Sequence, residues 1–381
     1  MTGGPVHGPK GYIEGRTLTV VKRIEGIDPL SLVNLSTNET CLGPAPGVAE
    51  AVARAGAQAH RYADAACTRL RVALARSFSL RPDCIVIGNG SEEILDMVGR
   101  VYARPGDEIL YPAHSFLQFG IVAYRLGVAA VEAPLGPGFT VDVDALLAAV
   151  TARTRILFLA TPNNPTGVAV PHDAVQEIAR RLPPHIVLVL DCAYAEFGDP
   201  DAAEGALDLA RARPNVLVTR TYSKAYGMAA LRAGWATGPE AIVAALNNIR
   251  GIGNVSGPTQ DAAIVALEAT DHVARVVAHA RAERAWLSDR LAALGFAVVP
   301  SATNFVFARM PEGSAVTAGE AVLHLARNGI LIRANEDYGL PDWLRISLGH
   351  RPDMARTVQL LAEATGARET PDPTAGATGR L

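Results

Sequence analysis

The sequence VLVTRTYSKAYGMAALRAGWATG, residues 216–238, contains the pattern that decides the fold of this protein. Its first three residues are apolar and predict a buried strand, and the polar turn Thr221–Lys224 follows. In α/β folds, ligands bind beyond the carboxyl ends of the strands. Lys224 therefore occupies a position typical of a functional residue, although most lysines in such turns are simply solvated.

Two neighbours of Lys224 favour a functional interpretation. Ser223 precedes it and Arg232 follows eight positions later, so that a hydroxyl and a guanidinium can converge on one anion. A lysine whose surroundings lower its pKa becomes a nucleophilic amine and forms a Schiff base with a carbonyl. Lysine, hydroxyl and arginine together fit an aldehyde cofactor that carries a phosphate, and this combination predicts pyridoxal 5′-phosphate.

Four earlier segments repeat the pattern of an apolar strand followed by a polar or Gly/Pro turn, with helical stretches between them. Strands that alternate with helices predict an α/β fold with a mainly parallel sheet. After about residue 240 the chain is mostly helical, and four later strand-like segments predict a smaller lobe. The four earlier segments are CIVIGNGSEE (84–93), EILYPAHSF (108–116), TRILFLATPNNPTG (154–167) and HIVLVLDCAY (185–194).

These patterns predict a division of the chain into domains. We expect residues 1–44 to form an N-terminal arm and part of the small domain, and residues 45–255 to form the large, cofactor-binding domain. Residues 256–368 are expected to form the small C-terminal domain. The segment 369–381 is rich in Pro, Gly and Thr and predicts a flexible tail.

Composition limits the classes of partner. The 381 residues are 49% hydrophobic, which is enough for two lobes. The 35 basic and 38 acidic residues give a net charge of −3, so neither a nucleic acid nor a membrane surface is expected as a partner. Four cysteines show no CxxC pair or metal-ligand spacing, which favours a reduced cytoplasmic protein without a metal site. No signal peptide or membrane-spanning run is apparent, so we expect a soluble protein.

The turn GNGSEE, residues 88–93, is a candidate phosphate site. It follows the apolar run Cys84–Ile87 and opens a predicted helix with Ser91 near its N-cap. The free N–H groups and the positive dipole end of such a helix suit a phosphate. The same pattern is also found where a helix merely begins well, so the turn alone leaves both interpretations open.

Two further turns place polar side chains at strand ends. In ATPNNPTG, residues 160–167, Asn164 can donate a hydrogen bond to a ring hydroxyl, or the turn can simply end the strand. Asp191 follows the apolar run Ile186–Leu190, where a carboxylate is costly unless a cation meets it. That cation is either a structural arginine or the protonated ring nitrogen of the cofactor. Tyr194 can reach the same ring oxygen as Asn164.

In this order and spacing, the motifs GNGSEE, TPNNPTG, DCAYAEF, TYSKAYGMAALRAGW and LRISLG resemble the class I/II aminotransferases of pyridoxal-phosphate fold type I. Within that class the chain is most similar, from about Tyr12 to about Ala364, to the histidinol-phosphate aminotransferases. The segments NLSTNETCLGPAP, RYAD and GILIRAN support this resemblance. It implies a large domain with a mainly parallel central sheet flanked by helices, a smaller α+β domain, and pyridoxal 5′-phosphate as the cofactor.

The resemblance also implies roles for individual residues. Lys224 corresponds to the Schiff-base lysine and Asp191 to the partner of the pyridine nitrogen, while Asn164 and Tyr194 bind the ring oxygen. The active unit is expected to be a homodimer with shared active sites. The other implied cofactor contacts are Ser91, Glu92, Ser223 and Arg232 at the phosphate, Phe116 stacked on the ring, and Tyr62 at the cofactor phosphate of the neighbouring subunit.

Three residues are expected to contact the substrates. By resemblance, Arg345 in WLRISLG binds the α-carboxylate and Arg333 in GILIRAN meets a substrate phosphate, with Tyr12 also in the pocket. An arginine in an apolar strand usually belongs to a structural ion pair, but two of them near a proposed anion site favour function. The implied reaction is a ping-pong transfer of an amino group between an amino donor and a 2-oxo acid, such as glutamate and 2-oxoglutarate.

Departures from the subgroup pattern leave the substrate open. RYAD replaces the commoner Arg-Tyr-Pro-Asp, and YPAHSFLQFG lacks the usual tyrosines, although no catalytic group is lost. Aminotransferases for aromatic or unusual amino acids in specialised metabolism are therefore alternatives. Threonine-phosphate decarboxylases also share the lysine and the aspartate but break a different bond at Cα. A cofactor-binding sensor would need an added DNA-binding domain, for which we expect no room in 381 residues.

Overall fold

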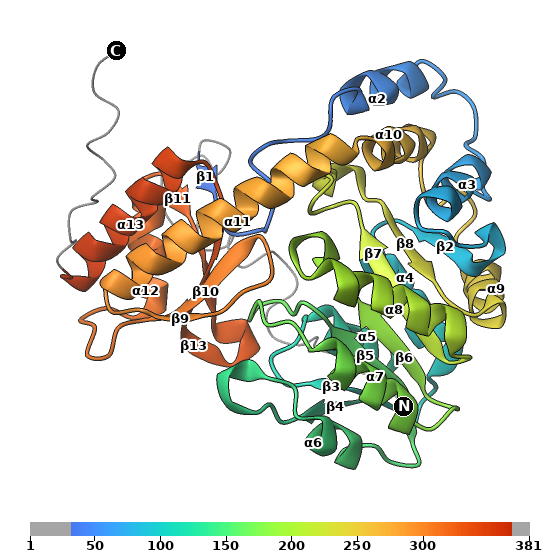
Figure 1. Ribbon diagram of the computed structural model, residues 1–381, viewed down its shortest axis with the longest axis horizontal. Helices are drawn as coiled ribbons and strands as arrows, with labels where there is room; N and C mark the ends of the chain where they lie inside the picture. Colours follow the sequence, from blue (N-terminus) through green and yellow to red (C-terminus); the bar gives the residue numbers. More distant parts are fainter. Residues whose placement is uncertain (1–31, 368–381) are drawn as a thin grey trace, which may run out of the picture.

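The computed structural model describes residues 32–367, which form two lobes joined by a long helix (Figure 1). The larger lobe contains a seven-stranded sheet and the smaller lobe a four-stranded one. The predicted α/β fold is confirmed. The helix that runs along both lobes is α11 (Thr270–Ala293).

The seven-stranded sheet is parallel except for one strand. That strand, β8 (Gly234–Thr237), is antiparallel to both of its neighbours. Parallel neighbours need a helical crossover, and the link between β7 and β8 contains only a 3-10 turn at Ala229–Leu231, so the chain returns antiparallel. The strand order across the sheet is β2 (Ile85–Gly88), β8, β7 (Val216–Thr221), β6 (Val187–Asp191), β5 (Thr154–Ala160), β3 (Glu108–Pro112) and β4 (Ala129–Ala133).

Helices cover both faces of this sheet because its central strands are apolar on both sides. In β5, Ile156 and Phe158 pack toward one layer of helices, whereas Leu157 and Leu159 pack toward the other. The first layer consists of α4 (Ser91–Tyr102), α5 (Gln118–Leu126) and α9 (Glu240–Ile249). The second consists of α3 (Thr68–Ser77), α6 (Val143–Ala148), α7 (His172–Arg181) and α8 (Pro200–Ala212).

The parallel strands bring three of the predicted turns to one edge of the sheet. In the register of β5, β6 and β7, Asp191 pairs with Ala160 on one side and with Thr219 on the other. The turns that carry Asn164 and Lys224 follow directly after β5 and β7. The carboxyl edge therefore gathers residues that are far apart in sequence.

The smaller lobe is an antiparallel sheet with the order β12 (Arg333–Asn335), β13 (Leu340–Ser347), β10 (Phe305–Arg309) and β9 (Ala297–Val299). One face of this sheet turns toward the large lobe. There, Phe139 packs edge-on against Phe307 at 5.7 Å and against Trp343 at 5.0 Å between ring centroids. The helices α11, α12 (Ala318–Arg327) and α13 (Arg351–Thr365) pack on the other face. Arg333 and Arg345 both lie on the face turned toward the large lobe.

The first elements of the described chain contact both lobes. Strand β1 (Val33–Asn34) pairs in parallel with β11 (Ile330–Leu331), so the chain starts its described course beside the small lobe. Helix α2 (Val48–Gly56) packs on α10 (Gly257–Glu268), as Figure 1 shows at the top of the large lobe. The division of the chain at residues 45, 256 and 369 stays a proposal.

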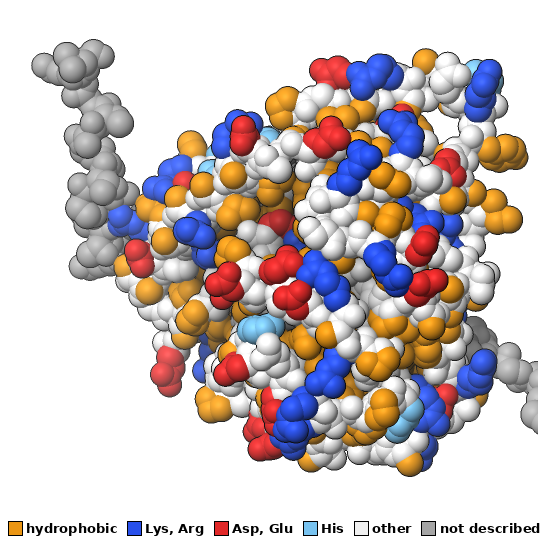
Figure 2. Space-filling view, turned by 45° about the vertical axis from the view of Figure 1, so that its right-hand side comes forward, with side chains coloured by type: hydrophobic (Ala, Val, Ile, Leu, Met, Phe, Trp, Pro, Cys, Tyr) orange, Lys and Arg blue, Asp and Glu red, His pale blue; other side chains and the backbone are white. Residues whose placement is uncertain are grey.

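The surface carries charged side chains of both signs. Basic and acidic side chains are interspersed over the face that Figure 2 presents. Within residues 32–367, each helix is either too short or too polar to cross a bilayer.

Candidate active site

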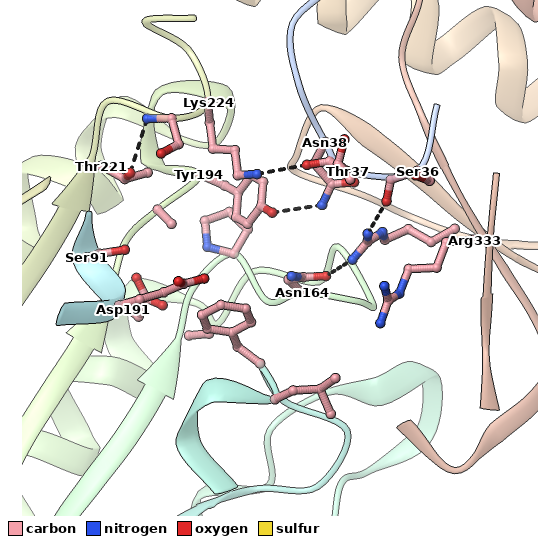
Figure 3. Close-up of a pocket in the computed structure, with 18 of the residues that line it drawn as sticks. Ser36, Thr37, Asn38, Ser91, Asn164, Asp191, Tyr194, Thr221, Lys224 and Arg333 are labelled. Carbon is pink, nitrogen blue, oxygen red and sulfur yellow. Dashed lines mark hydrogen bonds between the residues drawn. The ribbon is translucent and has the colours of Figure 1, made fainter. Parts of the chain in front are cut away.

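A cavity of about 440 Å³ lies between the carboxyl edge of the large sheet and the small lobe (Figure 3). Most of the predicted site residues line it, although they come from widely separated segments. Tyr12 and the segment 369–381 lie outside the described residues. The predicted residues on the cavity wall are Ser91, Glu92, Phe116, Asn164, Asp191, Tyr194, Ser223, Lys224, Arg232, Arg333 and Arg345.

The amine of Lys224 points into the cavity. Its Nζ donates a hydrogen bond to the backbone oxygen of Thr37 at 3.1 Å and lies 5.8 Å from the centre of the Tyr194 ring. Burial of the ammonium, and then the positive charge of Arg345, lower the pKa of Lys224 to about 8. The unprotonated fraction of this amine near neutral pH is therefore larger than that of an ordinary lysine, which favours a nucleophile.

The carboxylate of Asp191 is 3% exposed at the end of β6. It accepts a hydrogen bond from Thr219 Oγ1 at 3.0 Å. Burial raises the pKa of Asp191 to about 6, and the hydrogen bonds from Thr219 and from the backbone of Ala193 oppose that rise. No lysine or arginine of residues 32–367 forms an ion pair with Asp191. The structural-arginine alternative therefore has no support within the described chain, and a protonated ring nitrogen fits this place.

The turn before α4 has the features of a phosphate-binding site. Gly90 occupies the N-cap and has no side chain, so the first N–H groups of α4 are left for another acceptor. A Cβ atom on Gly90 would lie 2.6 Å from Nη2 of Arg232, which shows how closely the guanidinium approaches this turn. Arg232 also donates to Ser223 Oγ at 3.2 Å and pairs with Glu92 at 3.5 Å. Ser91 is the first residue of α4 and lines the same cavity as Ser223 and Arg232.

Tyr194 and Asn164 lie on the wall that faces Lys224. Tyr194 is buried, and its hydroxyl oxygen accepts a hydrogen bond from Asn38 Nδ2 at 2.8 Å. Burial raises the pKa of Tyr194 to about 12, so the hydroxyl keeps its proton at neutral pH. Asn164 accepts a hydrogen bond from Arg345 through Oδ1, which leaves its NH2 group as the donor end of the amide. Both side chains can therefore donate to a ring oxygen.

The two arginines approach from the small lobe. Arg345 is 4% exposed and donates to the backbone oxygen of Ser36 at 2.5 Å. Arg333 pairs with Asp337 at 2.5 Å and lies over the ring of Tyr338. The Nε atoms of both arginines are buried and have no hydrogen-bond partner within residues 32–367. The arrangement is suited to an anion.

Two predicted residues differ from the rest in their surroundings. Phe116 lies on the cavity wall and packs edge-on against Phe119, with 6.0 Å between ring centroids. Tyr62 is fully exposed and does not belong to the cavity of this chain. A contact between Tyr62 and a cofactor therefore needs a second chain.

The sequence did not single out several residues that line or support the site. Thr219 is a polar residue inside the apolar strand VLVTRT, and this was the available signal for its role beside Asp191. The segment Ser36–Asn38 belongs to NLSTNETCLGPAP, which supported the family resemblance but suggested no role for single residues. Tyr338 also lines the cavity and ends the 3-10 turn Glu336–Tyr338, whose sequence gave no chemical signal.

Comparison with known proteins identifies the family. The model of the family "Aminotransferase class I and II" matches residues 31–360. The chain belongs to the class I and II aminotransferases. It is 42% identical to the histidinol-phosphate aminotransferase of Paramagnetospirillum magneticum over 90% of this chain and 94% of that protein. It is 43% identical to the enzyme of that name from Sphingopyxis alaskensis over 91% of this chain and 94% of that protein.

Solved structures agree with this assignment. The histidinol-phosphate aminotransferase of Sinorhizobium meliloti, solved with pyridoxal 5′-phosphate, has a TM-score of 0.83 and 29% identity, covering 93% of this aminotransferase and 98% of that chain. A Thermus thermophilus aspartate aminotransferase variant has a TM-score of 0.78 and 26% identity, and the match covers 92% of this chain and 94% of that chain. The predicted family, fold type and cofactor are confirmed: this is a pyridoxal-phosphate-dependent aminotransferase.

Proposed function

We propose that this aminotransferase exchanges an amino group between histidinol phosphate and 2-oxoglutarate, in two half-reactions that share one cavity. The observation that carries the proposal is the pair Arg333 and Arg345, which face the amine of Lys224 from the small lobe. Glutamate has two carboxylates, whereas histidinol phosphate has a phosphate ester and no carboxylate. Two neighbouring arginines in one cavity suit both kinds of anion. The relatives named after histidinol phosphate support the same substrate.

The residues of the chain have separate tasks in this proposal. Bound pyridoxal 5′-phosphate supplies an electron sink that makes the Cα proton of the substrate acidic. Lys224 Nζ, with its pKa lowered to about 8, takes that proton and later returns it. Asp191 places a buried negative charge where the ring nitrogen needs it. Tyr194 and Asn164 donate to the ring oxygen.

The ends of the substrate and cofactor are held by separate groups. Ser91 and Glu92, through their backbone N–H groups, together with Ser223 and Arg232 hold the cofactor phosphate beside α4. Arg345 binds the α-carboxylate of glutamate, while Arg333 binds the phosphate of histidinol phosphate. Phe116 and the other cavity walls exclude water from the ring face. Tyr12 is proposed as a further pocket residue.

We also propose that the active unit is a homodimer in the cytoplasm. Three large apolar side chains of the described residues are exposed: Tyr62 at 105%, Ile252 at 97% and Ile249 at 42%. A second subunit would remove these side chains from water. In that contact, Tyr62 is proposed to reach the cofactor phosphate of the partner. All four cysteines are free, as expected for a reducing compartment.

A substrate panel tests the proposal. The holoenzyme is mixed separately with histidinol phosphate, glutamate, aromatic amino acids and threonine phosphate, and the change in the visible absorbance of the cofactor is followed. We expect the absorbance change to have its largest second-order rate constants with histidinol phosphate and glutamate. We expect no carbon dioxide to form with any of these compounds. Faster reaction with an aromatic amino acid would reject the substrate assignment. Release of carbon dioxide from threonine phosphate would reject the reaction.

A further inference from the structure

The segment Ser36–Asn38 reaches three proposed active-site residues at once (Figure 3). Arg345 and Lys224 donate to backbone oxygens of this segment. The contact with Tyr194 is different because it uses a side chain: Nδ2 of Asn38 donates to the tyrosine hydroxyl oxygen at 2.8 Å. This contact therefore depends on the identity of the residue at position 38.

Ser347 fixes the orientation of the Asn38 amide. The backbone N–H of Asn38 donates to Ser347 Oγ at 2.8 Å, and Ser347 Oγ donates to Asn38 Oδ1 at 3.0 Å. A serine hydroxyl has a single proton, and because Ser347 Oγ already accepts from the Asn38 N–H, the amide oxygen is the partner that can accept this proton. The NH2 end of Asn38 must then face Tyr194. Asn38 and Ser347 are each 1% exposed, so water does not compete for these bonds.

The direction of these bonds determines what the Tyr194 hydroxyl can do. A tyrosine hydroxyl has one proton to donate, and its oxygen already accepts from Asn38. The proton is then available to an acceptor in the cavity that Tyr194 lines. We propose that Asn38 and Ser347 are positioning residues that commit the Tyr194 hydroxyl to donate to the ring oxygen of the bound cofactor. The inference rests on the proposed role of Tyr194.

The opposite orientation of the amide would have the opposite effect. With its oxygen toward Tyr194, Asn38 would accept the tyrosine proton, and the hydroxyl could no longer donate to the cavity. Ser347 would also lose the acceptor for its own proton. A hydrogen bond donated to an anionic oxygen favours the anion and so lowers the pH at which it is protonated. Losing the bond should raise that pH.

Substitutions in the holoenzyme test the direction of the bonds. In Asn38→Asp, a carboxylate of the same shape accepts the Tyr194 proton, whereas Ser347→Ala frees the amide to reverse without adding a charge. The visible absorbance of the bound cofactor is titrated against pH. We expect the midpoint to rise by about one pH unit in Asn38→Asp, and by less in Ser347→Ala.

A double-mutant cycle separates positioning from other effects. Tyr194→Phe removes the hydroxyl, so Ser347→Ala should cause no further shift in that background, and the shift caused by Asn38→Asp should fall at least by half. Equal shifts in both backgrounds would overturn the inference. If Asn38→Asp does not fold, the Ser347→Ala cycle decides by itself. A Tyr194→Phe enzyme with an unchanged midpoint would instead overturn the proposed role of Tyr194, and with it this inference.

Asn304 offers a matched control. Its Nδ2 donates to the backbone oxygen of Asn38 at 2.9 Å, and it is also buried. Asn304→Ala loosens the same residue but leaves the side-chain bonds between Ser347, Asn38 and Tyr194 intact. We expect a lower melting temperature and an unchanged midpoint of the absorbance titration. A shift as large as that of Ser347→Ala would mean that any loosening of the segment suffices, which would overturn the inference.

Discussion

Arg333 and Arg345 are cross-strand partners in the antiparallel pair β12 and β13, and both line the active-site cavity. Like charges directly opposite each other in a sheet repel. Burial, and then the charge of Arg333, lower the pKa of Arg345 to about 10. Asp337 pairs with Arg333 but no carboxylate of residues 32–367 pairs with Arg345. An anion bound between the two arginines therefore stabilises an arrangement that is unfavourable without it.

Arg333→Ala should separate the two substrates. Loss of charge-assisted hydrogen bonds to a phosphate costs about 2–3 kcal/mol, so KM for histidinol phosphate should rise roughly 30- to 150-fold. KM for glutamate should change far less, because Arg345 remains. Steady-state kinetics with each substrate measure the difference. An equal effect on both substrates would contradict the assignment of Arg333.

Arg309→Ala is the matched control for this experiment. Arg309 belongs to β10 of the same sheet, but its side chain is 58% exposed and does not line the cavity. We expect both KM values to stay within about twofold of the native enzyme, because an exposed ion pair contributes little.

Arg345→Gln should raise the pKa of the Lys224 amine. Arg345 is the second-largest cause, after burial, of the lowered pKa of about 8. Without its positive charge the ammonium form is less unfavourable, so a higher pH is needed to free the amine. The rate at which the apoenzyme captures added pyridoxal 5′-phosphate, followed by visible absorbance, should show a midpoint near pH 8 in the native enzyme. The variant should give a higher midpoint; a lower one would contradict the electrostatic argument.

Asp191→Asn should stabilise the apoenzyme. Since the folded protein raises the Asp191 pKa from 3.8 to about 6, it binds the proton more tightly than the unfolded chain, and stability falls as pH rises between these values. At pH 7 the free energy of unfolding of the variant should exceed that of the native protein by up to about 3 kcal/mol. The two free energies should become nearly equal near pH 4. Denaturant unfolding at several pH values measures this. Asp144→Asn supplies a control, since Asp144 is 83% exposed and its ion pair with Arg181 should contribute less than about 1 kcal/mol.

Lys224→Ala should abolish the visible absorbance of bound cofactor and reduce turnover by at least about 10²- to 10⁴-fold, because both the covalent link and the general base are lost. Absorbance spectra after dialysis and a single-turnover assay measure the two effects separately. Substantial activity in this variant would reject the assignment of the catalytic lysine.

Gly90→Ala should weaken binding of the cofactor phosphate at the turn before α4. Gly90 has φ of +84°, and an added Cβ would lie 2.6 Å from Arg232. The ψ of 164° at Gly90 completes a backbone conformation that is open almost only to glycine, so we expect a loss of stability of about 1–3 kcal/mol, together with at least tenfold weaker binding of pyridoxal 5′-phosphate. Gly127→Ala is the control, because φ is +65° there and its Cβ would meet no atom within 4 Å. It should lose stability without losing cofactor affinity.

Local sequence was sufficient to predict the cofactor-binding edge of the sheet. Asp191 is the last residue of β6 and Lys224 lies three residues after the end of β7, and parallel strands must end at a common edge. The fold class followed from the alternation of strands and helices. What local sequence could not predict was the antiparallel direction of β8, since direction depends on the length and path of the link between strands.

The partners of the site residues depended on tertiary structure. Asn38 and Ser347 are 309 positions apart and have no pattern in common, yet they form a buried pair that orients Tyr194. Asp337 is only four residues from Arg333, but a turn between β12 and β13 is needed to bring the two together.

The sequence by itself determined the family, the fold class and the chemistry at the strand ends, because these are properties of short motifs and their order. The tertiary structure alone decided how that chemistry is tuned. The lowered pKa of Lys224 and the raised pKa of Asp191 both arise from burial, and burial exists only after distant segments have packed around the cavity. The turn Thr221–Lys224 thus supplies the amine, while residues from the opposite lobe set its proton affinity.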